Sequence, residues 1–255
     1  MSKFVDKLQR LSRSSVPSIG FQAAASELKG PVMLLIAGLP GVEVSEAETI
    51  ADMDADAALI LNQNLDIKLA KQMIEAAGDI PLGVFVKDMS EENVNELAGS
   101  GCDFAVFDVK MSAVALQEER IGRFLMVEPT LEQGLVRAIN SLDVDGVFLN
   151  RGEESFITVE HLLICQRFNE LLSKPLVVML PSLVTGAELN NLWQIGIHGI
   201  IVPPTQPKEA ITELRGMIDN LPKGTKRRRG KIDVVLPHYG ESVAVEEEEE
   251  EEEEE

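Results

Sequence analysis

A structural unit that recurs four times constrains the fold of this chain more than any other sequence feature. Each copy holds two apolar runs with a helical stretch and a small turn between them. Most of the eight runs are continuous rather than alternating, which is typical of strands covered on both faces in a parallel sheet. The runs are PVMLLIAG (31–38), AALILN (57–62), PLGVFVK (81–87), FAVFDV (104–109), RFLMVE (123–128), GVFLN (146–150), PLVVMLP (175–181) and GIIVP (199–203).

A hydroxyl residue follows the first strand of each copy and is predicted to open a helix. These residues are Ser45, Ser90, Thr130 and Thr185, and the residues three positions later are Glu48, Asn93, Gln133 and Glu188. Three of the four pairs match a capping box. An open doubly wound sheet could also hold eight strands, but four βαβ units suit a closed ring better. We therefore predict an α/β fold, a single (β/α)8 TIM barrel.

Composition divides the chain into three parts. Residues 1–30 are expected to form an N-terminal helix and lead-in, and residues 31–222 the barrel. Residues 223–255 hold a basic segment, the patch IDVVLP and ten terminal glutamates. Blocks of like charge stay solvated, so this C-terminal tail is predicted to be disordered. IDVVLP could instead dock as an added strand or bind a partner.

Charge and cysteine usage exclude several classes of protein. Without the six basic and twelve acidic residues of 223–255, the chain keeps −14 of its net charge of −20, so we expect no nucleic-acid partner. It has no apolar run of the length of a membrane span, and from its polar first residues we expect no secretory leader. Cys102 and Cys165 are predicted to be buried thiols of a reducing compartment, which indicates a cytoplasmic protein.

The helix predicted over residues 3–13 has an apolar face and a basic one. Phe4, Leu8 and Leu11 share one face, and Lys3, Lys7, Arg10 and Arg13 lie mostly elsewhere. Such a helix can make a weak peripheral contact with an anionic membrane. Since the apolar face is short, packing against the bottom of the barrel or against a partner is the favoured interpretation.

The segment LVTGAELNNLWQIGIHGIIV (183–202) resembles the last quarter of ribulose-phosphate-binding-type TIM barrels. The resemblance rests on a helix that ends in a Gly-x-x-Gly-like turn before strand eight. It implies phosphate binding at glycine-rich tips after strands seven and eight. In this sequence the two tips read Pro181-Ser182 and Pro203-Pro204-Thr205. Proline has no N–H to offer an anion, so the sequence departs from the family here.

The predicted strand ends supply the candidate catalytic residues, because active sites of TIM barrels lie at the carboxyl ends of their strands. Strands three, four and five end at Lys87, Asp108 and Glu128. We expect the three side chains to point into one mouth. The charged group of Lys87 is expected to lie within about 4 Å of at least one of the two acids. A structural ion-pair cluster is the alternative interpretation of this set.

Three further residues are predicted to bind substrate. Asn62 and Asn150 end strands two and six, and Arg151 opens the polar loop NRGEESFI (150–157), which could act as a lid. The asparagines could instead only cap turns. His161 and Cys165 stand four apart on a helix, but the sequence offers no further ligand cluster beside them. No metal site and no cofactor are therefore expected.

These residues predict a small-metabolite enzyme of lyase or aldolase type. Lys87 would be the electrophile or Schiff-base donor, and Asp108 and Glu128 the acid–base groups. The alternative is a non-catalytic barrel that serves as a scaffold or binding protein through its charged C-terminal tail. A small-molecule metabolite is the expected partner, and the sequence does not predict the oligomeric state.

Overall fold

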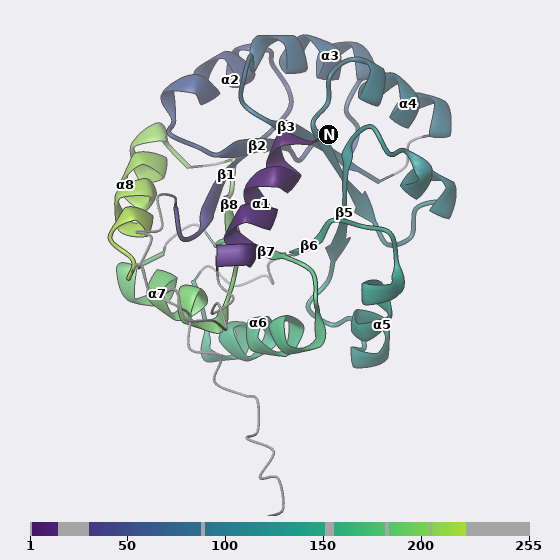
Figure 1. Cartoon of the computed structure of the whole chain (residues 1–255). Helices are drawn as coiled ribbons and strands as arrows, with labels where there is room; N and C mark the ends of the chain where they lie inside the picture. Colours follow the sequence, from purple (N-terminus) through teal and green to yellow (C-terminus); the bar gives the residue numbers. More distant parts are fainter. Residues whose placement is uncertain are drawn as a thin grey trace, which may run out of the picture.

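The computed structural model describes residues 2–14, 31–87, 90–150, 156–181, 184–204 and 206–222. Eight parallel strands form one closed barrel in the order of the sequence, with β8 paired to β1 (Figure 1). The fold prediction is thus confirmed, and all eight apolar runs contain a strand. The strands are β1 (Leu34–Leu39), β2 (Ala57–Ile60), β3 (Leu82–Val86), β4 (Phe104–Asp108), β5 (Gly122–Val127), β6 (Gly146–Leu149), β7 (Leu176–Met179) and β8 (Gly199–Val202).

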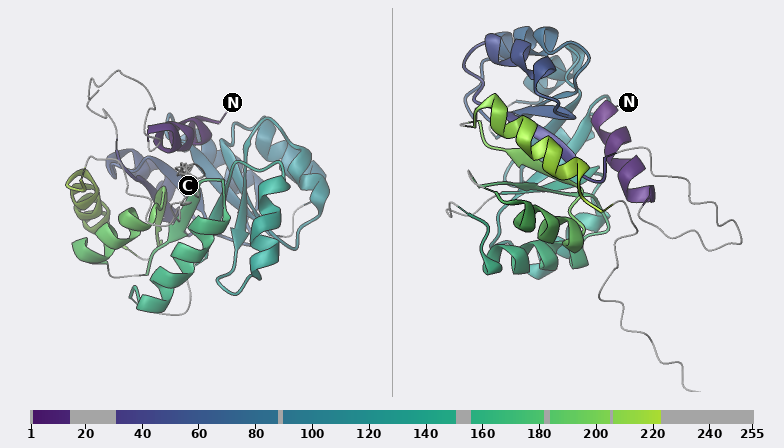
Figure 2. Two further views of the ribbon diagram at one scale, coloured as in Figure 1. Left: turned by 60° about the horizontal axis from the view of Figure 1, so that its bottom comes forward. Right: turned by 90° about the vertical axis from the view of Figure 1, so that its left-hand side faces the viewer.

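Helices surround the barrel, and one further helix lies across its end (Figures 1 and 2). That helix is α1 (Lys3–Ser14). The surrounding helices are α2 (Ser45–Glu48), α3 (Ile67–Ala76), α4 (Glu91–Gly99), α5 (Gln133–Ala138), α6 (Val159–Leu171), α7 (Gly186–Ile195) and α8 (Lys208–Asp219). Short 3-10 helices are η1 (Thr49–Asp52), η2 (Ala113–Gln117) and η3 (Ile139–Ser141).

Two of the four predicted helix starts are confirmed. Ser90 caps α4 by accepting a hydrogen bond from the backbone of Asn93. Thr185 caps α7 in a complete capping box with Glu188. The third start is right in position only, because Ser45 is the first residue of α2 but the N-cap is Val44, and no side chain caps this helix. The fourth is wrong, since α5 begins three residues after Thr130.

The strand side chains form two separate apolar layers, as their alternation requires. One layer faces the helices and the other fills the barrel. Phe104, Phe124 and Phe148 are fully buried in the inner layer, and glycines on neighbouring strands lie next to the first two. A Cβ atom on Gly83 would lie 2.2 Å from the ring of Phe104, so only glycine fits beside that ring. Large and small residues thus alternate around the lower barrel.

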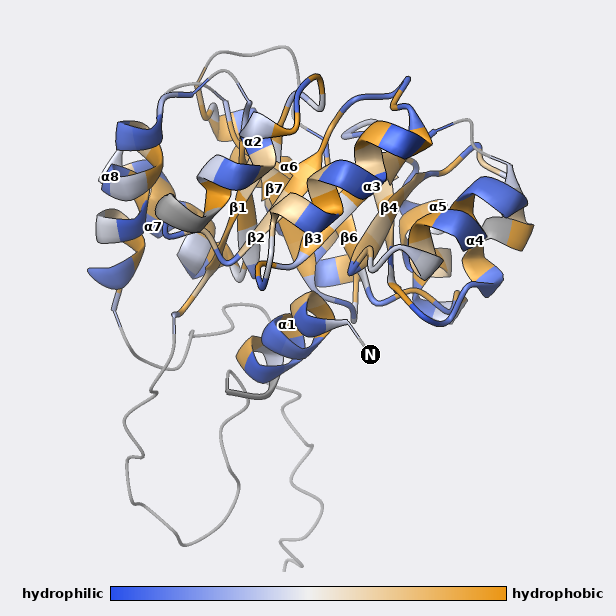
Figure 3. Cartoon of the chain, turned by 90° about the horizontal axis from the view of Figure 1, so that it is seen from above, coloured by the Kyte–Doolittle hydropathy of each residue, from blue (hydrophilic) through white to orange (hydrophobic). Residues whose placement is uncertain are grey.

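Helix α1 closes the amino-terminal end of the barrel, which we call the floor (Figure 3). The ring of Phe4 lies 4.4 Å from that of Phe104 and 5.3 Å from that of Phe124, centroid to centroid. Phe4 and Leu8 are almost fully buried. The predicted packing of this helix against the barrel is confirmed. A membrane contact through the same apolar residues would require α1 to leave the floor.

An acidic residue before β4 fixes the start of α1. The carboxylate of Asp103 accepts hydrogen bonds from the hydroxyl of Ser2 at 2.8 Å and from the backbone of Lys3 at 2.7 Å and Phe4 at 3.0 Å. The carboxylate therefore satisfies two of the unpaired N–H groups at the start of the helix. It also interacts favourably with the positive end of the helix dipole.

The same floor position occurs in all four sequence repeats. Its occupants in the other copies are Asp56, Asp145 and His198, which accept a backbone N–H from the preceding strand at 2.9, 2.8 and 3.3 Å. The backbone N–H of all four residues donates to that preceding strand. Asp103 is the exception, since its side chain binds α1 instead. The repeat thus extends to hydrogen bonds that the sequence analysis did not consider.

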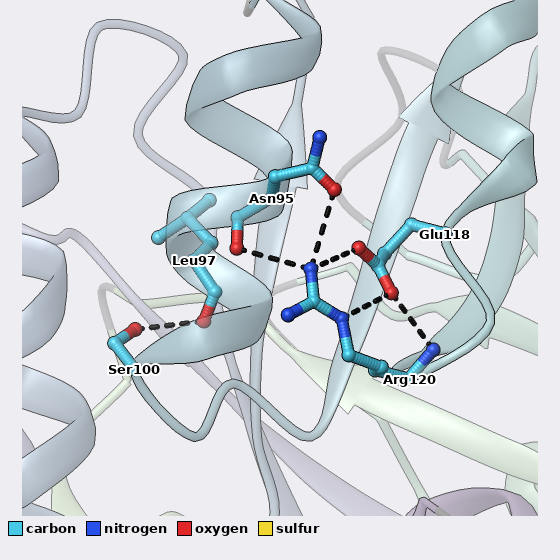
Figure 4. A network of polar contacts seen from close by, with 5 residues as sticks. All are labelled: Asn95, Leu97, Ser100, Glu118 and Arg120. Atoms are coloured by element: carbon cyan, nitrogen blue, oxygen red, sulfur yellow. Dashed lines mark hydrogen bonds and ion pairs between the residues drawn. The ribbon is translucent and has the colours of Figure 1, made fainter.

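The connection between β4 and β5 contains η2 in place of a full α-helix. Polar contacts fasten this shorter connection to α4 (Figure 4). The guanidinium of Arg120 binds the carboxylate of Glu118 and donates to the side-chain oxygen of Asn95 at 3.2 Å. The hydrogen bond from Arg120 lowers the pKa of Glu118. These contacts add to the packing of Met111, Leu116 and Ile121 from the same connection against the core.

Two further predictions concern membrane-spanning helices and the C-terminal segment. Within the described ranges, none of the helices combines the length and apolarity that crossing a bilayer demands. Residues 223–255, with the basic segment, IDVVLP and the glutamate tail, lie outside the described residues. Each barrel strand pairs with a neighbour on both sides, so the barrel offers IDVVLP no free edge.

Candidate functional site

The carboxyl ends of β3 to β6 place polar side chains at the mouth of the barrel. Phe85, Phe104, Phe124 and Phe148 belong to the inner layer. Because strand side chains alternate, the residues an even number of positions later share this inward register. They include Lys87, Asp108, Glu128 and Asn150.

The opposite wall of the mouth is apolar. Leu61 and Met179 pack against the inner layer after β2 and at the end of β7. Pro181 and Pro203 follow in buried positions. Leu61, not Asn62, continues the inward series of β2, so aligning Asn62 with the other strand ends was wrong by one residue. Polar groups are therefore gathered on the β3–β6 side.

Lys87 is exposed and binds a neutral partner. Its Nζ donates to Oε1 of Gln63, in the loop after β2, at 3.0 Å. Among the described residues it makes no ion pair within 4 Å, so the predicted approach to Asp108 or Glu128 is not observed. Sequence analysis missed Gln63. The signal available was its place one residue beyond a predicted strand.

The strand register explains why the predicted cluster separates. Extending the β3–β4 register by one step places Lys87 beside Asp108. Asp108 itself lies opposite Met126, so Glu128 is two residues, or about 7 Å, further along β5. The Asp108 carboxylate also accepts the backbone N–H of Lys110 at 2.8 Å, and it is therefore occupied in a local turn. The three charged residues therefore lie at the same mouth, but Glu128 lies further along the barrel axis than Lys87 and Asp108.

Glu128 pairs with a predicted binding residue instead. Nδ2 of Asn150 donates to Oε1 of Glu128 at 2.9 Å across the β5–β6 boundary. The amide of Asn62 is used in the loops, where Nδ2 donates to the backbone oxygen of Gly41 and Oδ1 accepts from Asn64. Arg151 lies outside the described residues. Roles in substrate binding for these three residues remain predictions.

Two carboxylates fill backbone donor sites at other loops after strands. The backbone N–H groups of Gly41, Val42 and Glu43, after β1, donate to the carboxylate of Glu46 at 2.7, 3.1 and 3.2 Å. At the start of α7, the backbone N–H and the hydroxyl of Thr185 both donate to Oε2 of Glu188 at 2.7 Å.

The two cysteines and His161 do not add chemistry to the mouth. Burial raises the pKa of Cys102 and that of Cys165 to about 12, so both thiols stay protonated near neutral pH. Burial also lowers the pKa of His161. Within the described ranges, no three side chains among His, Cys, Asp and Glu gather where a metal ion could bind.

Comparison with known proteins identifies the fold and not the activity. No family model and no curated protein matches the chain. A mutant tryptophan synthase α-subunit of Pyrococcus furiosus matches with a TM-score of 0.55 and 13% identity, over 74% of this chain and 96% of that one. A tryptophan synthase structure from Mycobacterium tuberculosis matches with a TM-score of 0.58 and 12% identity, over 85% and 95%. These matches agree with the (β/α)8 barrel fold that the sequence predicted.

Proposed function

We propose that this chain is a small-metabolite enzyme of lyase type with its active site at the carboxyl-terminal mouth of the barrel. One observation carries the proposal. Four consecutive strands place Lys87, Asp108, Glu128 and Asn150 at the inward register of the mouth, opposite an apolar wall. A wall of this kind favours burial of one side of a ligand while the polar side orients it. The structural neighbours are α-subunits of an enzyme built on the same fold, which is compatible with this proposal.

The proposed role of Lys87 is to bind or activate a carbonyl or carboxylate group. A carboxylate partner would hold the lysine in its charged form and work against Schiff-base chemistry. The observed partner is the neutral amide of Gln63, so this obstacle is weaker than the sequence predicted. In the same proposal Asp108 and Glu128 move protons. Each has one carboxylate oxygen without a hydrogen bond to the described residues, and a substrate could reach that oxygen.

Reductive trapping tests the Schiff-base form of this proposal. Wild-type protein is treated with borohydride and a panel of small aldehydes and keto acids, and the adducts are located by mass spectrometry. We expect one preferred adduct, on Lys87, and its loss in Lys87→Ala. Lys110→Ala is the matched control, because Lys110 is an exposed lysine at the rim of the same mouth. Equal labelling of Lys87 and Lys110 would rule out a Schiff-base lysine.

A non-catalytic binding barrel is the second candidate function. It is favoured by the local hydrogen bonds of the strand ends, since Asp108 binds the backbone of Lys110 and Asn62 that of Asn64. Turns make such bonds without any catalytic role. A thermal-shift screen of metabolites separates the two candidates. Ligand effects that persist unchanged in both Lys87→Ala and Glu128→Gln would favour the binding barrel.

A further inference from the structure

The loop after β1 forms an anion site that the protein fills itself. Three successive backbone N–H groups, those of Gly41, Val42 and Glu43, converge on the carboxylate of Glu46 within 3.2 Å. Consecutive N–H groups of this kind form a concavity that binds phosphate in other proteins. In this chain the carboxylate of Glu46 occupies this concavity. An external anion would therefore have to displace a carboxylate that belongs to the same chain.

The start of α7 is a second position where an anion could bind, and a carboxylate of the chain fills it as well. Helix starts bind phosphate because their N–H groups are unpaired and the helix dipole is positive there. The carboxylate of Glu188 accepts from both the backbone and the hydroxyl of Thr185 at 2.7 Å. A phosphate at this end of α7 would meet a fixed negative charge. The donors that it would need are partly occupied.

The described residues at the tip of β8 are mostly prolines and are closely packed. Pro203, Pro204 and Pro207 lack the N–H groups that a phosphate would accept from. Beside them, a Cβ atom on Gly38 would lie only 2.5 Å from the backbone oxygen of Val202 and 3.4 Å from Cδ of Pro204. Space for even a methyl group is therefore missing between β1 and β8 at this level.

The opposite side of the mouth offers the complementary groups. Lys87 is a cation whose partner among the described residues is the amide oxygen of Gln63, at 3.0 Å. The pair formed by Glu128 and Asn150 presents acceptor oxygens on β5 and β6. A carboxylate suits the first group, and a hydroxyl or ammonium group suits the second.

We infer that the mouth takes an unphosphorylated hydroxy- or amino-carboxylate, with its carboxylate at Lys87 and its hydroxyl or ammonium group at Glu128 and Asn150. The inference rests on the proposed function, because it assumes that the mouth is the ligand site. It goes further by naming the substrate class. It also separates this chain from the phosphate binding that the family resemblance implied at strands seven and eight.

Matched ligand pairs test the substrate class. Glycerate with 3-phosphoglycerate, and serine with O-phosphoserine, are titrated calorimetrically into wild-type protein, Lys87→Ala and the rim control Lys110→Ala. We expect the unphosphorylated member of at least one pair to bind about tenfold more tightly or better. Its binding should be lost in Lys87→Ala and kept in Lys110→Ala. Tighter binding of the phosphorylated members would overturn the inference.

Removing the carboxylates that fill the two anion sites, those of Glu46 and Glu188, gives an independent test. Inorganic phosphate, compared with chloride at equal ionic strength, should leave the melting temperature of wild-type protein unchanged. It should raise that of Glu46→Ala or Glu188→Ala by about 2 °C or more, since an emptied site can bind the anion. Glu43→Ala is the control in the same loop, and circular dichroism checks that each variant is folded.

The outcomes separate the two proposals. Stabilisation of wild type by phosphate would overturn the inference, as would a lack of response in both folded Glu46→Ala and Glu188→Ala. If these variants respond but neither class of ligand binds wild type, the filled anion sites stand and the proposed function fails.

Discussion

The floor and the mouth of this barrel are built from similar polar residues that have different partners. At the floor, the bonds that hold the terminal helices join residues far apart in sequence, with separations of 99 to 101 between Asp103 and the segment Ser2 to Phe4 and of 159 between Arg215 and Asp56. The floor bonds of Asp56, Asp145 and His198 to the preceding strands span only 21 or 22 positions. At the mouth, the bonds of Lys87, Asp108 and Glu128 span between 2 and 24 positions.

This difference separates stability from function. Bonds between distant segments help to hold the two ends of the described chain on the barrel, so breaking one should loosen a helix that buried apolar residues also anchor. Bonds within loops or between adjacent strands only set local geometry, and they leave side chains free to meet a ligand. In TIM barrels the amino-terminal face generally serves stability and the carboxyl-terminal face serves catalysis. The predictions below test this division, from the largest expected effect to the smallest.

Removing the ring of Phe4 should have the largest effect on stability. Phe4 is fully buried among Phe104, Phe124 and Phe148. Phe4→Ala should lower the free energy of unfolding by about 3–5 kcal/mol, because the substitution loses burial and leaves a cavity. Chemical denaturation measures the loss. The control is Phe156→Ala, since Phe156 is 56% exposed and should lose far less. Equal losses would show that α1 is not part of the core.

Asp103→Asn should loosen α1 without emptying the barrel. The substitution removes the charge that interacts with the helix start and weakens the three hydrogen bonds to Ser2, Lys3 and Phe4. We expect a loss of about 1–2 kcal/mol. Hydrogen exchange should accelerate across α1 before it does so elsewhere. Asp79→Asn is the control, because Asp79 is fully exposed and, among the described residues, meets only Lys3. Unchanged exchange in α1 would contradict the proposed cap.

Acidification should weaken the contact between η2 and α4 by a small amount. Arg120 lowers the pKa of Glu118 below the ordinary glutamate value of about 4.3. A carboxyl group whose pKa is lowered on folding stabilises the protein at higher pH, and this stabilisation is lost as the pH falls through the lowered pKa. The melting temperature of wild type should therefore fall more steeply below about pH 4 than that of Glu118→Gln. Parallel pH profiles would show that the contact adds nothing.

Lys87→Ala should change stability least. Lys87 is exposed and bonds to the exposed side chain of Gln63, so the free energy of unfolding should stay within about 0.5 kcal/mol of wild type. The same variant should lose the ligand binding proposed for the mouth. A large loss of stability would mean that the mouth is structural, and the contrast with the floor would then disappear.

The sequence analysis predicted the strands and the ring more reliably than the site. Continuous apolar runs such as FAVFDV contain the strands because burial on both faces leaves a strong local signal. The expected ion pair is missing for two reasons that no local pattern shows. The register places Asp108 opposite Met126 and so moves Glu128 to a higher level. Asp108, which the register places beside Lys87, accepts the backbone N–H of Lys110 instead. Side-chain direction at a strand end also depends on the neighbouring loop, as the bond from Lys87 to Gln63 illustrates.

Helix caps show the same limit at a smaller scale. Thr185 and Ser90 were predicted correctly, because a hydroxyl can reach its own helix start without help from the rest of the fold. Ser45 opens α2 without capping it, and Thr130 was predicted wrongly. The loop at Ser45 is instead organised by Glu46, whose carboxylate takes the backbone donors there.

The sequence by itself determined that this chain has eight buried parallel strands, four repeated units and an amphipathic leading helix. Those properties follow from periodicity and burial, which each segment carries in its own residues. Tertiary structure alone decided that Asp103 would hold α1 while its three counterparts bind the barrel. It also decided that Lys87 would meet an amide and not an acid. The physical reason is that a hydrogen bond or ion pair requires two groups within a few ångströms, and strand register and helix docking set that separation.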